Sequence, residues 1–210
     1  MGDEEAPQCK VEYLDNPEGP EETNWIKRAG RAKVTYPNGC TFEGTFDTEK
    51  VKQGPGVYVW MGPAGGEDES LVEKSRYDGN YKNGLKDGYG KMIYPNGDIY
   101  EGMWVENKME GEGTYTYKKT GDIYSGAWVA NSKNGQGRYE FGADFSILNG
   151  IWANGQILSG SWEFQGAGKY DGQFKLGRPI GSGTFSFPSG LSQVCRYAIL
   201  FWFYRSCFTL

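Results

Sequence analysis

Residues 77–147 read YDGNYKNGLKDGYGKMIYPNGDI (77–99), YEGMWVENKMEGEGTYTYKKTGDI (100–123) and YSGAWVANSKNGQGRYEFGADFSI (124–147). The three segments repeat one pattern with a period of 23 to 24 residues. A period of this length is typical of repeat architectures, in which each unit covers the apolar face of the next. We therefore expect an array of repeats rather than a fold built around one central nucleus.

Each repeat has the alternation of a pair of β-strands. Tyr100, Gly102 and Trp104 are two residues apart, so they share one face of an extended chain. Residues 113–117 repeat this alternation after a polar segment, and turn residues such as 95–97 (PNG) separate the repeats. Each repeat is therefore predicted to form a β-hairpin.

The glycines of the pattern need an explanation, because glycine weakens a strand interior. An aromatic–Gly–aromatic face allows an aromatic ring to lie flat over backbone that carries no side chain. One hairpin cannot cover such a face alone, whereas consecutive hairpins paired edge to edge can. The glycines assigned this structural role are Gly44, Gly79, Gly102, Gly126, Gly150 and Gly172.

The pattern resembles the MORN repeat (membrane occupation and recognition nexus), whose signature is Y-x-G-x-W followed by G-x-G and a second aromatic strand. The signature is matched by residues 77–81 with 88–90, 100–104 with 111–113, and 124–128 with 135–137. Weaker copies extend the resemblance over about residues 30–190. It implies an all-β fold, an elongated, twisted, single-layer antiparallel sheet of six or seven consecutive hairpins.

Three segments depart from the regular repeat. Residues 1–29 are acidic and are expected to form an arm that is disordered or bound to a partner. Within the array of 30–190, residues 61–75 are predicted to be a loop insertion, either a partner contact or a solvated spacer. Residues 148–168 are predicted to be a contracted repeat that turns at Asn154-Gly155.

The apolar tail, 191–210, is too short in its apolar run (197–204) to span a bilayer. A further strand or packed tail, docking into another subunit, and a membrane-surface anchor are the three alternatives.

No catalytic, cofactor-binding or metal-binding residue is predicted, and we expect no enzyme activity. The chain has no histidine, which excludes histidine-based nucleophilic catalysis and the commonest metal ligand. Glycine pairs such as those at 88–90 lack the Lys-Ser/Thr of a phosphate loop. The recurring acids Glu43, Asp78, Glu101 and Asp171 fall on the strand face opposite the rings, which indicates a solvated face.

The charge is unevenly distributed. Residues 1–24 contain eight acids and one lysine, and the remainder contains 19 acids and 21 bases. A nearly neutral body does not favour nucleic acid or an anionic membrane, and no stable membrane insertion is expected. The four cysteines lie far apart and no secretory signal opens the chain, so reduced thiols in a cytosolic protein are expected.

One row of rings is a candidate surface for an extended peptide or a helix of a partner. These rings could instead cover backbone within the array, and we expect them to do both. The candidate partner-binding residues are Phe46, Tyr81, Trp104, Trp128, Trp152, Trp162 and Phe174.

The order of the repeats carries a second resemblance. Regular copies are followed by a contracted copy with W-x-N-G-Q (152–156), then by Y-x-G-x-F (170–174) and the closing run at 177–183. This succession is similar to the small MORN subunits of the axonemal radial spoke head. It implies a structural scaffold in the cilium or flagellum axoneme, within the cytoplasm and cytoskeleton.

The implied partners are other radial spoke head subunits, including a second MORN subunit or a second copy of this chain, with indirect contact to the central apparatus. Such a scaffold would take part in mechanical signalling to the dyneins that drive motility. The alternative is a MORN-type protein that tethers membranes or binds lipid.

Overall fold

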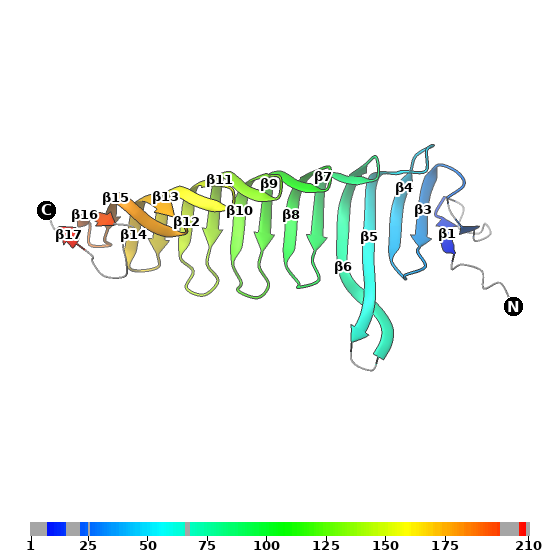
Figure 1. Cartoon of the computed structure of the whole chain (residues 1–210), viewed down its shortest axis with the longest axis horizontal. Coiled ribbons are helices and arrows are strands. Elements are labelled where there is room, and N and C mark those ends of the chain that lie inside the picture. Colours follow the sequence, from blue (N-terminus) through cyan, green and yellow to red (C-terminus); the bar gives the residue numbers. More distant parts are fainter. Residues whose placement is uncertain (1–7, 16–21, 25, 66–67, 198–205, 209–210) are drawn as a thin grey trace. The chain divides into compact units, whose positions relative to one another are not determined.

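The computed structural model describes residues 8–15, 22–24, 26–65, 68–197 and 206–208. Every regular element in these ranges is a β-strand, which confirms the prediction of an all-β fold made of consecutive hairpins (Figure 1). The chain divides into two compact units, residues 1–108 and 109–210.

The first unit is an open antiparallel sheet. Its strands pair in the order β2–β1–β3–β4–β5–β6–β7–β8. Their bounds are β1 Cys9–Tyr13, β2 Glu22–Asn24, β3 Gly30–Thr35, β4 Thr41–Phe46, β5 Lys52–Gly65, β6 Asp68–Lys82, β7 Leu85–Ile93 and β8 Ile99–Val105.

The second unit is built in the same way, and each of its strands pairs antiparallel with the next. The bounds are β9 Lys108–Thr116, which starts at the boundary, β10 Ile123–Val129, β11 Ser132–Glu140, β12 Ile147–Ala153, β13 Gln156–Phe164, β14 Gly168–Lys175, β15 Arg178–Ser186, β16 Ser192–Tyr197 and β17 Ser206–Phe208.

In the five repeats from β6–β7 to β14–β15, the two strands are joined by a turn of two residues that both have positive φ, whereas residues 47–51 join β4 to β5. Such turns match the right-handed twist of the strands they join. Asn154-Gly155 has this geometry, and so do Glu106-Asn107 and Ala130-Asn131, although neither pair contains glycine. The turn predicted to distinguish the contracted repeat is therefore the common turn of the array.

The repeat at 148–168 is contracted in the connection that follows β13. Three residues (165–167) separate β13 from β14, whereas five (94–98) separate β7 from β8 and six (141–146) separate β11 from β12. Tyr124 and the equivalent Leu148 are 24 residues apart, whereas Leu148 and Tyr170 are 22 apart. The shortened connection therefore makes this repeat two residues shorter than the one before it.

In the segment predicted to be a loop insertion, 61–75, residues 61–65 and 68–75 are instead strand. β5 and β6 continue past their neighbours as a two-stranded ribbon, with Gly62 opposite Val72 and Gly65 opposite Asp68 (Figure 1). Glycine, proline and acidic residues suggested a loop, but residues 68–75 supply enough strand-forming side chains, including Leu71 and Val72, to pair with 59–65.

Part of the predicted arm is also ordered into the sheet. β1 pairs with β3, so Val11 and Tyr13 are buried beside Val34 and Ala32. The Tyr13 hydroxyl accepts hydrogen bonds from the backbone N–H groups of Lys27 and Arg28. The acidic composition of 1–29 concealed this short alternation. Residues 1–7, 16–21 and 25 of the arm, and 198–205 and 209–210 of the tail, lie outside the described residues.

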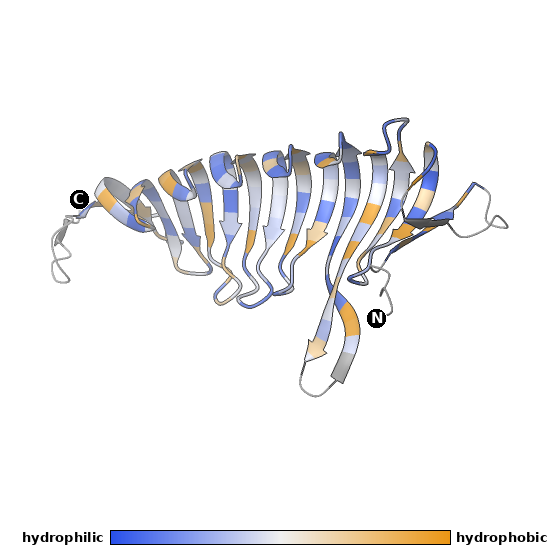
Figure 2. Ribbon diagram, turned by 45° about the vertical axis from the view of Figure 1, so that its right-hand side comes forward, coloured by the Kyte–Doolittle hydropathy of each residue, from blue (hydrophilic) through white to orange (hydrophobic). Residues whose placement is uncertain are grey.

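The core consists of one face of each sheet, where rings lie over Gly44, Gly79, Gly126 and Gly172 as predicted, whereas the atoms nearest an added Cβ at Gly150 are backbone atoms of Ser159 and Gly160. Tyr77 lies over Gly79 and Gly90, and a Cβ added at Gly79 would stand 2.6 Å from its hydroxyl oxygen. The hydroxyl of Tyr124 donates to the carbonyl of Ala127, three residues on, so the ring extends over Gly126. Figure 2 shows the resulting alternation of hydrophobic and hydrophilic residues along the strands.

Candidate protein-binding surface

The structure places six of the seven candidate partner-binding rings in the core. Phe46, Tyr81, Trp104, Trp128, Trp152 and Phe174 are each at most 6 % exposed. Five of these rings pack edge-on against the aromatic residue four positions earlier, as Trp128 does against Tyr124 with centroids 5.2 Å apart. Trp152, which has Leu148 at that position, packs edge-on against Tyr124 of the preceding repeat instead. The indoles of Trp104, Trp128 and Trp152 donate to the carbonyls of Gly90, Gly113 and Gly137. These six rings therefore do not form an open groove; only Trp162 is half-buried.

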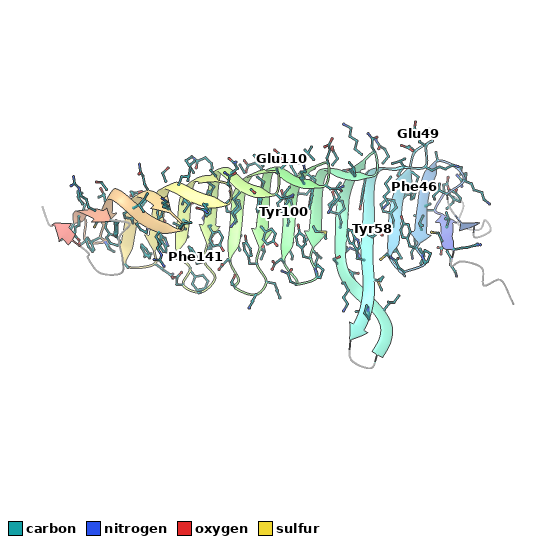
Figure 3. The ribbon with its side chains drawn as sticks, viewed as in Figure 1. Phe46, Glu49, Tyr58, Tyr100, Glu110 and Phe141 are labelled. Carbon is teal, nitrogen blue, oxygen red and sulfur yellow. The ribbon has the colours of Figure 1, made fainter. Side chains whose placement is uncertain are left out.

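A second row of rings, contributed by the second strand of each hairpin, is the one that reaches the surface in the second unit. We call it the aromatic ladder. Successive centroids are 4.6 to 6.2 Å apart, and the rings are half-buried except Phe187, which is 40 % exposed. Its members are Tyr115, Tyr117, Tyr139, Phe141, Trp162, Phe164, Phe185 and Phe187; Phe141 is labelled in Figure 3.

The ladder follows from strand parity. Tyr115 and Tyr139 are each directly opposite Tyr124 in the sheet, so they share its face. Tyr124 covers glycine and is buried, whereas ladder rings such as Tyr139 contact other ladder rings and Trp152 of the core. The first unit has a shorter version, in which Tyr58 contacts Tyr36 and Trp60.

Lysine side chains lie across the rings in three repeats. The Nζ of Lys133 is 4.4 to 5.3 Å from the ring centroids of Tyr117, Tyr124, Tyr139 and Trp152. Lys52 and Lys86 have similar surroundings in the first unit. Burial lowers the pKa of Lys133 to about 8, against a smaller opposing effect of Asp122, so the ammonium stays protonated at neutral pH.

These lysines predict a pH dependence of stability. Burial also lowers the pKa of Lys52 to about 8, so between pH 8 and 10.5 the folded chain binds fewer protons than the unfolded chain. The free energy of unfolding should therefore rise with pH in this window, by about 1 kcal/mol between pH 7.5 and 9.5, since both side chains keep part of their contact with water. Urea denaturation at several pH values measures the rise.

The matched variant is Lys133→Met, which keeps an unbranched side chain but has no proton to lose. It should show a smaller rise than the wild type, because Lys52 and Lys86, whose pKa burial also lowers, remain. Burial raises the pKa of Tyr124 to about 12, so tyrosine ionisation lowers stability only above about pH 10, outside the measured range. Identical pH profiles for the two proteins would contradict the assignment.

The ladder ends beside a cavity of about 480 Å³ in the second unit. Ladder rings Trp162, Phe164, Phe185 and Phe187 line it together with Pro179, Tyr170 and Tyr197 of the neighbouring strands. The cavity lining is mostly aromatic, which is typical of a site for an apolar or cationic side chain.

The opposite strand face is charged and solvated, as predicted for the recurring acids. Glu101 and Asp171 are exposed and Glu43 is half-buried. The carboxylates of Glu43, Glu101 and Asp171 lie 3.1 to 3.6 Å from the cationic groups of Arg31, Lys91 and Lys169, respectively. Cys9, Cys40 and Cys195 are free thiols. Within the described ranges, no group of three or more Cys, Asp or Glu side chains is arranged to hold a metal ion. No helix long and apolar enough to cross a bilayer occurs in the same ranges.

The comparisons with known proteins agree with this architecture. The family model described as "MORN repeat" matches residues 42–61, 77–99, 100–121, 124–142 and 170–192, which together make up just over half of the chain. The chain belongs to the MORN repeat family. The five MORN matches start at the rings that cover glycines, such as Phe42, Tyr77, Tyr124 and Tyr170.

Among curated proteins, this MORN chain is similar to alsin. It is 37% identical to alsin of Rattus norvegicus over 90 residues, and 37% identical to alsin of Homo sapiens over 83 residues. These matches cover 40% and 37% of this chain, which spans only about a twentieth of the length of alsin.

A search of solved structures found a likeness to the TCP domain of SAS-4 (dCPAP) of Drosophila melanogaster, in a complex with a proline-rich motif of Ana2 (dSTIL). It covers 80% of this chain and 73% of that chain at 13% identity, with a TM-score of 0.38.

Proposed function

We propose that this MORN repeat chain is a non-catalytic scaffold subunit of the radial spoke head of motile cilia and flagella. The scaffold function is supported by the difference in burial between the two rows of rings. The rings of the first row, such as Trp128 and Trp152, are buried and hold neighbouring strands together, whereas the ladder rings are half-buried. A contiguous exposed aromatic surface is typical of a site that binds another protein.

The assignment to the radial spoke rests on the resemblance carried by residues 152–156 and 170–183. In this role the sheet presents the ladder to fellow head subunits and keeps them at fixed positions. The head then contacts the central apparatus with a defined shape and relays mechanical signals to the dyneins. No reaction is required of the chain.

The test is recovery of the tagged full-length chain from salt-extracted axonemes, with the accompanying proteins identified by mass spectrometry. We expect radial spoke head proteins to accompany the wild type. Phe141→Ser, which interrupts the ladder beside Trp162, should reduce their recovery at least about tenfold, the effect of removing an interface residue worth 1.4 kcal/mol or more.

The matched control is Tyr89→Ser, which removes a ring that is 53 % exposed and absent from the ladder. Its recovery should equal that of the wild type. Recovery of the wild type only with proteins from outside the axoneme would overturn the radial spoke assignment. Equal losses for both variants would overturn the assignment of the ladder as the binding surface.

Membrane tethering is the competing function for a MORN protein, and it predicts a different result. Anionic surfaces attract clustered Lys and Arg, whereas residues 25–210 carry 19 acids and 21 bases. Pelleting with vesicles of phosphatidylcholine and phosphatidylserine should recover little protein at 0.15 M salt. Strong binding that falls as salt rises would favour the tether over the scaffold.

A further inference from the structure

We propose that the cavity beside Pro179 binds the side chain of a lysine supplied by a partner protein. The inference rests on the protein-binding part of the proposed function and names the chemistry that this surface recognises. It follows from a comparison of the cavity with the equivalent positions of the other repeats, where the chain fills the same place with its own side chains.

Strand register identifies the equivalent positions. Pro179 pairs with Phe174 in the sheet, as Lys133 pairs with Trp128, Ile157 with Trp152 and Lys86 with Tyr81. Lys52 pairs with Phe46 in the same way. We call this the plug position, because its side chain lies among the rings of its own and the neighbouring repeats.

The walls around the plug position are also equivalent. Lys133 is surrounded by Tyr117, Tyr124, Tyr139 and Trp152. Tyr170 and Phe185 are opposite each other, as Tyr124 and Tyr139 are. Tyr197 packs edge-on against Tyr170 with centroids 5.5 Å apart, as Trp152 does against Tyr124 at 5.3 Å. With Phe164 in the place of Tyr117, all four equivalent rings line the cavity beside Pro179.

The plug itself is what differs. A proline side chain is closed onto its own backbone nitrogen and cannot extend across the rings as a lysine does. The rings equivalent to those around Lys133 are therefore present, but Pro179 at the plug position is too short to fill the space between them. A cavity of about 480 Å³ is the result. The ring faces that attract the ammonium groups of Lys52, Lys86 and Lys133 have counterparts in this cavity.

The choice of a cationic over an aliphatic side chain follows from the wall. Ile157 is the plug in the repeat that has Leu148, rather than a ring, at the sequence position of Tyr124. In three repeats with a ring at the position of Tyr124, the plug is a lysine. Lys52 lies over Phe42, Lys86 over Tyr77 and Lys133 over Tyr124. Met109 has the same spacing from its turn in the repeat whose ring is Tyr100, and it is a buried, uncharged side chain. The cavity beside Pro179 has the aromatic residue, Tyr170, so its wall is of the kind that accompanies lysine in three of the four other repeats with a ring at this position.

The test uses the isolated full-length chain, so it is independent of any axonemal partner. The probes are n-butylammonium chloride, which has the end of a lysine side chain, and 1-butanol, its neutral match in size. NMR spectra of the aromatic side chains should show saturable shifts of Phe164, Phe185 and Tyr197 with butylammonium. Its dissociation constant should be roughly fivefold lower than that of 1-butanol.

Two variants locate the binding. Pro179→Lys supplies the ammonium from the chain itself and should abolish the shifts, with the free protein acquiring ring shifts that resemble the bound state. Phe185→Leu removes one wall ring but keeps an apolar side chain, and should weaken butylammonium binding at least about threefold while leaving butanol binding unchanged. The second variant decides the matter if the first fails to fold.

Equal affinity for the two probes would overturn the proposal in favour of an aliphatic occupant. No saturable shift with either probe would overturn it altogether, and so would shifts that persist in a folded Pro179→Lys variant. Success here with no radial spoke proteins in the axonemal recovery would leave the lysine site standing and remove the spoke assignment.

Discussion

Gly137→Ala should lower the free energy of unfolding by about 3 kcal/mol or more, although it adds only one methyl group. The added Cβ would stand 2.6 Å from Cε2 and Cζ of the Tyr124 ring. That ring cannot withdraw easily, because its hydroxyl donates to Ala127 and its edges pack against Trp128 and Trp152. The clash is therefore transmitted to two neighbouring hairpins. Urea denaturation followed by circular dichroism measures the loss.

The matched control is Gly177→Ala, which separates lack of space from backbone strain. Gly177 has φ near +71° and nothing within 4 Å of an added Cβ. Its substitution should cost only about 1 kcal/mol, the penalty of a left-handed conformation. If the two variants lost the same amount, the glycines of the repeat would be needed for backbone freedom rather than for the rings above them.

Strand alternation in the sequence was sufficient to predict the hairpins and the ring-over-glycine face, because both depend on period-two spacing within a single strand. The turns were harder to predict. Glu106 and Asn107 have φ of 48° and 68°, yet nothing in their composition distinguishes them from the polar residues that follow. The ribbon of β5 and β6 was missed because pairing between 59–65 and 68–76 depends on a partner strand rather than on local composition.

For the candidate surface, the sequence identified the face that carries the rings but could not show which row of rings is buried. Trp128 and Tyr139 are both aromatic residues on strands that share a face, so periodicity alone cannot rank their exposure. The difference arises from packing across strands: Trp128 reaches Gly113 of the preceding strand and is buried, whereas Tyr139 lies among other half-buried rings. The aromatic pairs spaced two apart in the second strand of each repeat, such as Tyr115 and Tyr117, were the available signal.

The same packing predicts that Trp128→Ala should lower the free energy of unfolding by about 3 to 5 kcal/mol. Its indole is 4 % exposed and packs edge-on against Tyr124. Truncation would leave a cavity within the sheet face and would also remove the donor 3.1 Å from the carbonyl of Gly113. The loss is measured by urea denaturation, with the dependence on denaturant used to check that unfolding stays two-state.

Trp162→Ala is the matched control, since it removes the same side chain from the ladder. Trp162 is half-buried and its indole donates to the hydroxyl of Ser146, so its loss should cost roughly 1 to 2 kcal/mol. Equal losses for the two tryptophans would show that the ladder is as much a part of the core as the first row. The ladder would then have little surface left for a partner, and the scaffold proposal would lose its physical basis.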